Sequence, residues 1–172
     1  GSSGALKIAA EFINCWLPDS AAWVSSPTWD NHAAILEGSG VVVRRYPYFD
    51  SRTGGLEFEG MRAELKHLPR RSVVVLHGCC HNPTGVDLSA GQWRELIELL
   101  KDKELLPLVD LAYQGLAQGL DEDAQPLRAM AEAGMAFLVA SSFSKNMSLY
   151  GERAGALSVV ASSAADAELV LG

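Results

Sequence analysis

A lysine beside two serines is the residue of this sequence that most directly suggests chemistry. Lys145 lies in Ser142-Phe143-Ser144-Lys145-Asn146, directly after an apolar run, and Arg153 follows eight residues later. Most lysines are solvated at the surface, whereas a lysine that forms a Schiff base needs a partly desolvated amine. The two hydroxyl groups and the guanidinium could together hold a phosphate dianion. The pattern favours a lysine that binds an anionic cofactor.

An aspartate ends a second apolar run. Asp110 follows Leu106-Pro107-Leu108-Val109, and a carboxylate buried there needs a cationic or hydrogen-bonding partner. One interpretation is a helix cap for the next segment. The other is an ion pair with a protonated pyridine nitrogen, the contact that makes pyridoxal phosphate (PLP) an electron sink. Tyr113 could point its hydroxyl group towards the same cofactor, although a lone aromatic residue at this spacing is more often core packing.

Four residues with metal-binding side chains lie close together: His77, Cys79, Cys80 and His81. Zinc needs ligands that converge, and neighbours at a strand end point in different directions. The sequence has no second pair with matching spacing, since His32 and His67 stand alone. We therefore predict no metal site. The following Asn82-Pro83-Thr84-Gly85 has strong turn chemistry and, taken alone, indicates only a turn.

Composition indicates one ordinary globular domain. The chain has 172 residues, of which 48% are hydrophobic and 20% charged, and its net charge is -7. An acidic chain without a basic stripe argues against a nucleic-acid partner, and no apolar run is long enough to span a bilayer. Three cysteines, two of them adjacent, do not make a disulfide framework. The N-terminus has no signal-peptide pattern, so we expect a cytoplasmic protein.

Strand-like and helix-like segments alternate along the chain. We predict helices over residues 5–16 with Trp16 on the apolar face, from an Asn31 cap to Gly38, around 58–65, from a Ser89–Gln92 capping box, from Pro126 to Gly134, and from Ser163 onwards. We predict strands at 22–24, 41–43, 72–76, 106–109, 136–140 and 154–161, with a polar turn at 50–55. Such alternation indicates a mostly parallel sheet covered on both faces.

Polar residues follow the apolar runs. They lie at Ser25 and Trp29, at 77–84, at 110–113 and at 141–145. In parallel sheets the binding crevice lies at the carboxyl ends of the strands. We therefore expect one active face there, shared by Trp29, Asn82, Asp110, Tyr113 and Lys145.

Five motifs in one order together resemble the aspartate/aromatic aminotransferases, a class I PLP-dependent family. They are Gly1-Ser2-Ser3-Gly4-Ala5-Leu6, Ser26-Pro27-Thr28-Trp29-Asp30-Asn31-His32, His81-Asn82-Pro83-Thr84-Gly85, Asp110-Leu111-Ala112-Tyr113-Gln114-Gly115, and Ser142-Phe143-Ser144-Lys145 through Tyr150-Gly151-Glu152-Arg153-Ala154-Gly155. The resemblance covers essentially the whole chain and is greatest to the bacterial tyrosine branch.

The resemblance implies a role for each matched residue. Lys145 would hold PLP covalently and move the proton between the substrate Cα and the cofactor. Asp110 would pair with the pyridine nitrogen, supported by His32, and Trp29 would stack on the ring. Tyr113 and Asn82 would contact the phenolic oxygen, and Trp29 and Asn82 would also meet the substrate. The phosphate would be held by four residues: Ser2, Ser3, Ser142 and Arg153.

The resemblance also implies the fold, the activity and what this chain lacks. We expect residues 1–172 to form the core of a three-layer α/β/α PLP-transferase large domain, with the 154–161 strand antiparallel. The family's N-terminal arm, small domain and carboxylate-binding arginines are absent from residues 1–172. The parent enzyme would be a homodimer that transfers an amino group between an aromatic or acidic amino acid and a 2-oxo acid.

Two alternatives to an aminotransferase fragment stay open. One is a PLP-binding module without turnover, and the other is different PLP chemistry on the same fold, which the aminotransferase motifs disfavour. Because the clamping arginines are absent, we expect little transamination by residues 1–172 alone. We also expect the 154–161 strand to be an association-prone sheet edge.

Overall fold

The structure is a computed structural model that describes residues 1–171. A six-stranded mixed sheet lies at the centre of these residues. The strand order is β2 (Val43–Pro47), β1 (Ala22–Ser26), β5 (Val73–His77), β6 (Leu106–Leu111), β7 (Phe137–Ser142) and β8 (Gly155–Val160). All neighbours are parallel except β7 and β8, which pair antiparallel. The predicted mostly parallel sheet with an antiparallel last strand is confirmed. Gly172, the last residue of the predicted domain, lies outside the described residues.

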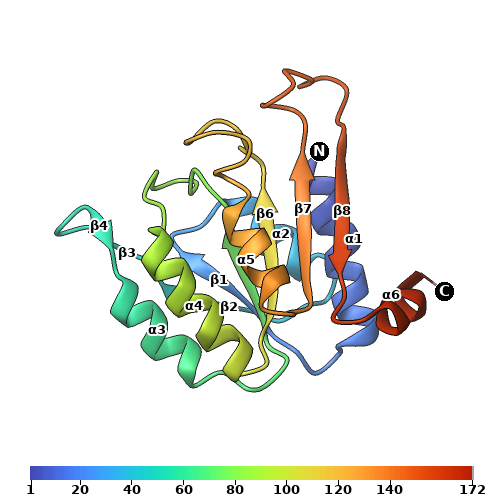
Figure 1. The fold of residues 1–172 in the computed structure, drawn as a ribbon. Coiled ribbons are helices and arrows are strands. Elements are labelled where there is room, and N and C mark those ends of the chain that lie inside the picture. The colour runs from blue at the N-terminus through green and yellow to red at the C-terminus, as the bar shows by residue number, and fades with distance from the viewer. Residues whose placement is uncertain (172) are drawn as a thin grey trace.

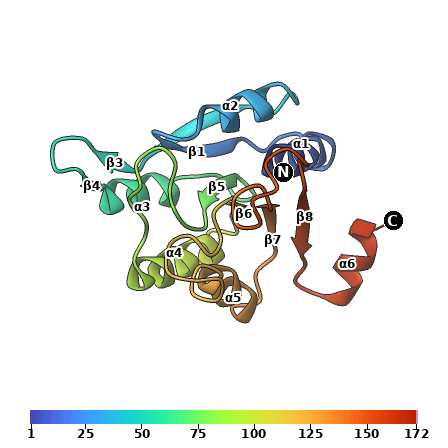
Figure 2. The ribbon, with the colours of Figure 1, turned by 90° about the horizontal axis from the view of Figure 1, so that it is seen from above.

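Helices cover both faces of this sheet. Helices α1 (Ser2–Trp16) and α2 (Asp30–Glu37) lie on one face, and α3 (Phe58–Lys66), α4 (Ala90–Asp102) and α5 (Gln125–Glu132) lie on the other, as Figure 2 shows. The short helix α6 (Ala164–Leu171) follows β8 and has no buried residue. The arrangement has the three layers that the sequence predicted.

Strand β5 shows why both faces can be covered. Its run of β-branched and apolar side chains alternates, so that Val73 and Val75 join the core under α1 while Val74 and Leu76 join the core under α4. A strand buried on both sides reads as a continuous apolar run. The predicted capping box at Ser89 and Gln92 starts α4, with both reciprocal hydrogen bonds present.

Three local predictions were wrong. Trp16 is 70% exposed, because it is the last residue of α1 and lies roughly 80° around the helix from Leu6. Asn31 is not a cap, since α2 begins at Asp30 and has Trp29 at its N-cap without a side-chain hydrogen bond. The second strand is Val43–Pro47 rather than 41–43, because the pairing with β1 begins at Val43.

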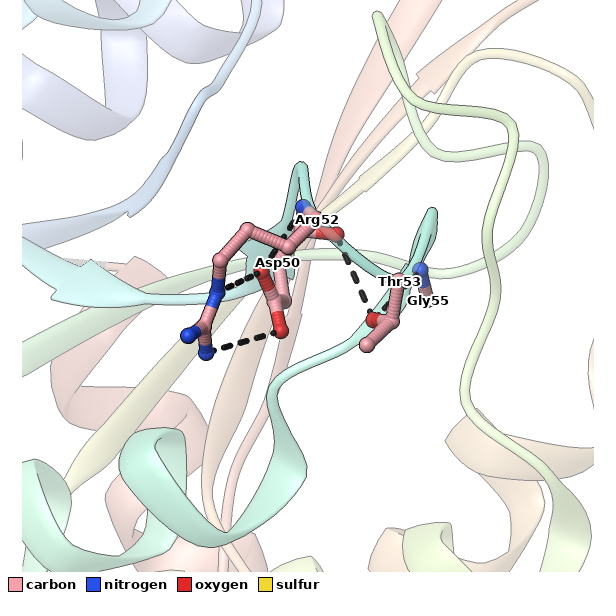
Figure 3. A network of polar contacts seen from close by, with 4 residues as sticks. All are labelled: Asp50, Arg52, Thr53 and Gly55. Carbon is pink, nitrogen blue, oxygen red and sulfur yellow. Dashed lines mark hydrogen bonds and ion pairs between the residues drawn. The ribbon is translucent and has the colours of Figure 1, made fainter.

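The polar turn predicted at 50–55 is confirmed, and it closes a two-stranded hairpin of β3 (Phe49–Asp50) and β4 (Gly55–Leu56) that the sequence pattern did not predict. Asp50 accepts hydrogen bonds from Arg52 N at 2.9 Å and Arg52 Nε at 3.3 Å, and Gly55 N donates to Thr53 Oγ1 at 3.3 Å (Figure 3). Gly54 has φ +69°, which glycine adopts without steric cost. These local contacts close the turn.

The strand ends point to where a site could form. The loops after β5, β6 and β7 rise at one end of the sheet, where the N-terminal end of α1 also lies (Figure 1). Within the described chain, no helix is both long and apolar enough to cross a membrane.

Candidate active site

A small crevice opens at the carboxyl ends of the parallel strands. Its volume is about 80 Å³, and its lining consists of Ser2, Trp29, His77, Asn82, Asp110, Ala112, Tyr113 and Lys145. Each comes from a different place in the chain: Trp29 directly precedes α2, Asn82 follows β5, Tyr113 follows β6 and Lys145 follows β7. The structure thus brings together the five residues that we expected on one active face. Two larger cavities lie elsewhere: one of about 430 Å³ beside α4 and α5, and one of about 480 Å³ near Arg71 and Leu106.

Asp110 is the most deeply buried acid in this crevice, with 4% of its surface exposed. Its Oδ2 lies 2.9 Å from His32 Nε2, and His32 Nδ1 lies 2.8 Å from Thr28 Oγ1. Asp110 Oδ1 is buried and has no hydrogen-bond partner within the described residues. A buried carboxylate oxygen without a donor is costly, so this atom is the place where a bound donor or cation would be stabilised.

The amine of Lys145 lies over the ring of Tyr113, with Nζ 4.6 Å from the ring centroid. This contact is a cation–π geometry, and it holds the lysine side chain against the crevice rather than in solvent. Lys145 is half-buried, in the turn that β7 delivers. The amine and the Asp110 carboxyl group therefore line the same small space, from two adjacent strands.

A cluster of potential anion ligands surrounds Gly1, the N-cap residue of α1. A Cβ placed on Gly1 would lie 3.1 Å from Ser142 Oγ, 3.3 Å from Ser144 Oγ and 3.6 Å from Arg153 Nη2. Ser144 Oγ is buried and has no partner within residues 1–171. The N-terminus of α1 adds unpaired backbone N–H groups, and helix N-termini favour anions. We call Gly1, Ser142, Ser144 and Arg153 the anion cup.

The two remaining serines that the resemblance assigned to the phosphate lie in the first turn of α1. Ser2 is buried and lines the crevice beside Lys145. Ser3 is half-buried and is not among the residues that line the crevice. Ser142 and Arg153 therefore belong to the anion cup, and Ser2 lines the crevice. The structure gives neither position for Ser3.

His77 lines the crevice but had no role in the sequence analysis beyond a rejected metal site. Its ring lies between those of His32 and His81, with centroids 5.0 and 4.2 Å away. Both ring nitrogens are buried without hydrogen-bond partners among the described residues. Burial, followed by the nearby His81 and His32, lowers the pKa of His77 to about 2. The sequence feature that could have identified His77 is its position directly after the apolar run 72–76. The structure places it in register with Asp110.

A metal ion has no evident place in this arrangement. Within the part of the chain that the structure describes, no group of three or more His, Cys, Asp or Glu side chains is placed to hold one. The rings of His77 and His81 instead contact each other with their planes tilted by 53°. Cys79 is buried as a free thiol whose pKa is raised by burial.

These features define the class of protein. A lysine, a buried carboxyl group with a free oxygen and an anion cup meet at the carboxyl edge of a mostly parallel sheet, and residues 1–170 match the family described as aminotransferase class I and II. The chain belongs to this family.

Individual relatives have narrower names. The tyrosine aminotransferase of Klebsiella pneumoniae and the aromatic-amino-acid aminotransferase of Escherichia coli are each 54% identical over 172 residues, which is 100% of this chain and 43% of either relative. The aspartate aminotransferase of Salmonella typhi is 49% identical over 170 residues, 99% of this chain and 42% of that protein. The chain therefore spans less than half the length of these relatives.

Solved structures share the fold closely. An aromatic amino acid aminotransferase from Burkholderia cenocepacia matches with a TM-score of 0.98 and 57% identity, covering 100% of this chain and 43% of that one. An aromatic-amino-acid aminotransferase from Burkholderia pseudomallei matches with a TM-score of 0.97 and 46% identity, over 99% and 43% of the two chains, and is described as covalently bound to pyridoxal phosphate. The predicted fold class is confirmed.

Proposed function

We propose that this chain forms the PLP-binding core of an aminotransferase that acts on aromatic or acidic amino acids and 2-oxo acids. The observation that carries the proposal is the free, buried Oδ1 of Asp110 in a crevice that also presents the amine of Lys145. A pyridinium N–H is the donor that such an oxygen lacks, and a lysine amine is the group that binds the cofactor's aldehyde.

The anion cup supports the same cofactor. A phosphate monoester carries nearly two negative charges and accepts several hydrogen bonds. The free Ser144 hydroxyl, Ser142, the Arg153 guanidinium and the N-terminus of α1 supply donors from one small region. The residues present therefore fit PLP at both ends, its ring nitrogen and its phosphate.

Bound PLP supplies an electron sink for charge that develops at the amino-acid Cα. The chain's own residues would do the rest. Asp110, oriented by His32, would keep a proton on the ring nitrogen, and Lys145 would move a proton between the Cα and the cofactor. Trp29 would cover the ring face, while Tyr113 and Asn82 would donate hydrogen bonds to the phenolic oxygen.

The names of the relatives support a class of substrate. Those relatives are named for tyrosine, aromatic amino acids and aspartate, which favours an aromatic or acidic amino acid as amino donor. We further propose that the parent enzyme is a homodimer, as the family resemblance implies. We propose a cytoplasmic location because the three cysteines are free thiols, as is usual in a reducing compartment.

Covalent trapping tests the assignment of the lysine. PLP-loaded protein is reduced with borohydride, digested and mapped by mass spectrometry. We expect the reduced adduct on Lys145 alone, and none in Lys145→Ala. An adduct mainly on Lys7, Lys101 or Lys103 would contradict the proposal.

Absorbance and a half-reaction complete the test. Adding tyrosine or aspartate to PLP-loaded protein and following the cofactor spectrum separates a transferase from a simple carrier. In the full-length parent enzyme, Asp110→Ala should weaken PLP binding and abolish the half-reaction, because the ring nitrogen loses its partner. A variant that keeps the rate of the unaltered protein would show that Asp110 does not have this role.

A further inference from the structure

The loop that carries Asn82, residues 78–87, is held by a set of contacts to which the proposed chemistry assigns no role. Asp87 closes it by accepting hydrogen bonds from Cys80 N at 2.7 Å and His81 N at 2.8 Å. Gly85 N donates to His81 O at 2.7 Å. These bonds fix the backbone on both sides of Asn82.

His81 connects this loop to the sheet. It is 2% exposed, its Nε2 lies 2.9 Å from Ser25 Oγ on β1, and its Nδ1 lies 2.8 Å from Thr84 Oγ1 within the loop. A neutral imidazole has one donor and one acceptor, and a hydroxyl group can meet either. Burial, followed by the nearby His32, lowers the pKa of His81 to about 4, so the ring stays neutral at physiological pH.

Tyr48 covers the other face of the His81 ring. The two rings are stacked with centroids 3.9 Å apart and planes 12° from parallel. The Tyr48 hydroxyl donates to Val86 O at 2.7 Å, so one side chain holds both the ring of His81 and the far end of the loop. Tyr48 is buried, with 4% of its surface exposed, and so it anchors the loop to the core next to β3.

Asn82 has no comparable support of its own. Within residues 1–171 no hydrogen bond joins its side-chain amide to another residue, although the residue lines the crevice. The position of that amide is therefore set by the backbone that His81 and its neighbours hold. A hydrogen bond to a reacting group depends on sub-ångström placement, so a loop that moves slightly would weaken it.

We propose that His81 and Tyr48 are positioning residues that fix the Asn82 amide against the phenolic oxygen of the cofactor. The inference rests on the proposed function, because the phenolic oxygen belongs to PLP. A hydrogen bond to this oxygen stabilises its ionised form and so lowers the pH at which the bound cofactor titrates. Loss of the bond raises that pH.

The test uses three variants and one matched control. His81→Phe keeps a ring against Tyr48 but removes both imidazole hydrogen bonds, and Tyr48→Phe removes only the bond to Val86 O. Asn82→Ala removes the amide itself. The control, Ser89→Ala, removes the cap of the following helix and touches none of the contacts described for this loop.

Hydrogen exchange is measured first, without cofactor. The amides of Cys80, His81 and Gly85 should exchange at least tenfold faster in His81→Phe than in Ser89→Ala, and a smaller increase is expected in Tyr48→Phe. Equal rates in His81→Phe and the control would show that His81 does not hold the loop, and would overturn the inference whatever the cofactor does.

The titration of bound PLP by absorbance is measured next. In His81→Phe the midpoint should rise by about one pH unit, since a hydrogen bond to a charged group contributes that order of energy. In an Asn82→Ala background, His81→Phe should add no further shift. A further shift there, or no shift in the single variant, would overturn the inference. Failure of the unaltered protein to bind PLP would instead refute the proposed function, and this inference with it.

Discussion

The pair of His32 and Asp110 allows the sharpest test of how the site is held together. His32 is 1% exposed, and its ring contacts Asp110 Oδ2 at 2.9 Å and Thr28 Oγ1 at 2.8 Å. His32→Leu fills a similar volume, so the cavity term should be small. The change leaves Asp110 without its described hydrogen-bond partner, because Oδ1 already has none. Stranding a buried carboxyl group costs about 3 kcal/mol, or roughly 6–12 °C in Tm for a chain of this size.

A double-mutant cycle separates this explanation from simple loss of packing. Asp110→Leu strands the His32 Nε2 and should cost about 1–3 kcal/mol. The double variant strands neither group, so it should be close to the unaltered protein in stability rather than at the sum of the two losses. Urea unfolding followed by tryptophan fluorescence measures all four proteins, since the chain has 4 tryptophans. A loss below about 1 kcal/mol for His32→Leu, or additive losses in the double variant, would refute the reasoning.

Three further outcomes follow from the structure. Burial lowers the folded-state pKa of His77 to about 2, far below the unfolded value near 6.5, so its contribution to stability is complete above pH 6.5 and falls as the pH drops. The free energy of unfolding measured in urea should therefore decline by about 2 kcal/mol between pH 6.5 and 5, and by less in His77→Gln. Ser89→Ala should cost about 1 kcal/mol, measured by the same unfolding assay, because α4 loses its capping box; an unchanged midpoint would be inconsistent with the cap. Gly78→Ala would place a Cβ 2.6 Å from Leu111 Cδ1 and 3.3 Å from Val109 Cγ1, so a loss of about 1–3 kcal/mol is expected from the forced shift, and thermal unfolding that matches the unaltered protein would contradict it.

Local patterns predicted the elements well where one residue type dominates. The run of Val73, Val74 and Val75 could only suit a strand buried on both faces, and Ser89 with Gln92 marked the start of α4. The predicted strand boundaries were wrong where pairing with a neighbouring strand sets them. Val42 is as β-branched as Val43, yet it is 59% exposed and lies outside the strand, because the register with β1 starts one residue later.

The residues of the site could be predicted from the sequence, but the contacts that support them could not. Lys145, Asp110 and Asn82 each follow an apolar run, so the edge of the sheet where they meet could be inferred. The stack of Tyr48 on His81 could not be predicted, because the two residues are 33 positions apart in the sequence. Tyr48 also directly precedes the β3–β4 hairpin, whose strands the turn pattern at 50–55 did not reveal. The position of the Ser144 hydroxyl could not be predicted either, because it depends on how closely Gly1 approaches the turn after β7.

The anion cup makes both ends of the described chain depend on each other. Gly1 N donates to Arg153 O, 152 residues away in sequence, and a Cβ on Gly155 would lie 2.7 Å from Gly1 C. At about 5–20 residues per second, a ribosome needs roughly 8–30 s to make that intervening stretch. The first turn of α1 therefore cannot contact Arg153 and Gly155 until nearly all of the sheet has been synthesised. The two groups of phosphate donors, near Gly1 and near Arg153, can therefore meet only after the stretch between them has been made.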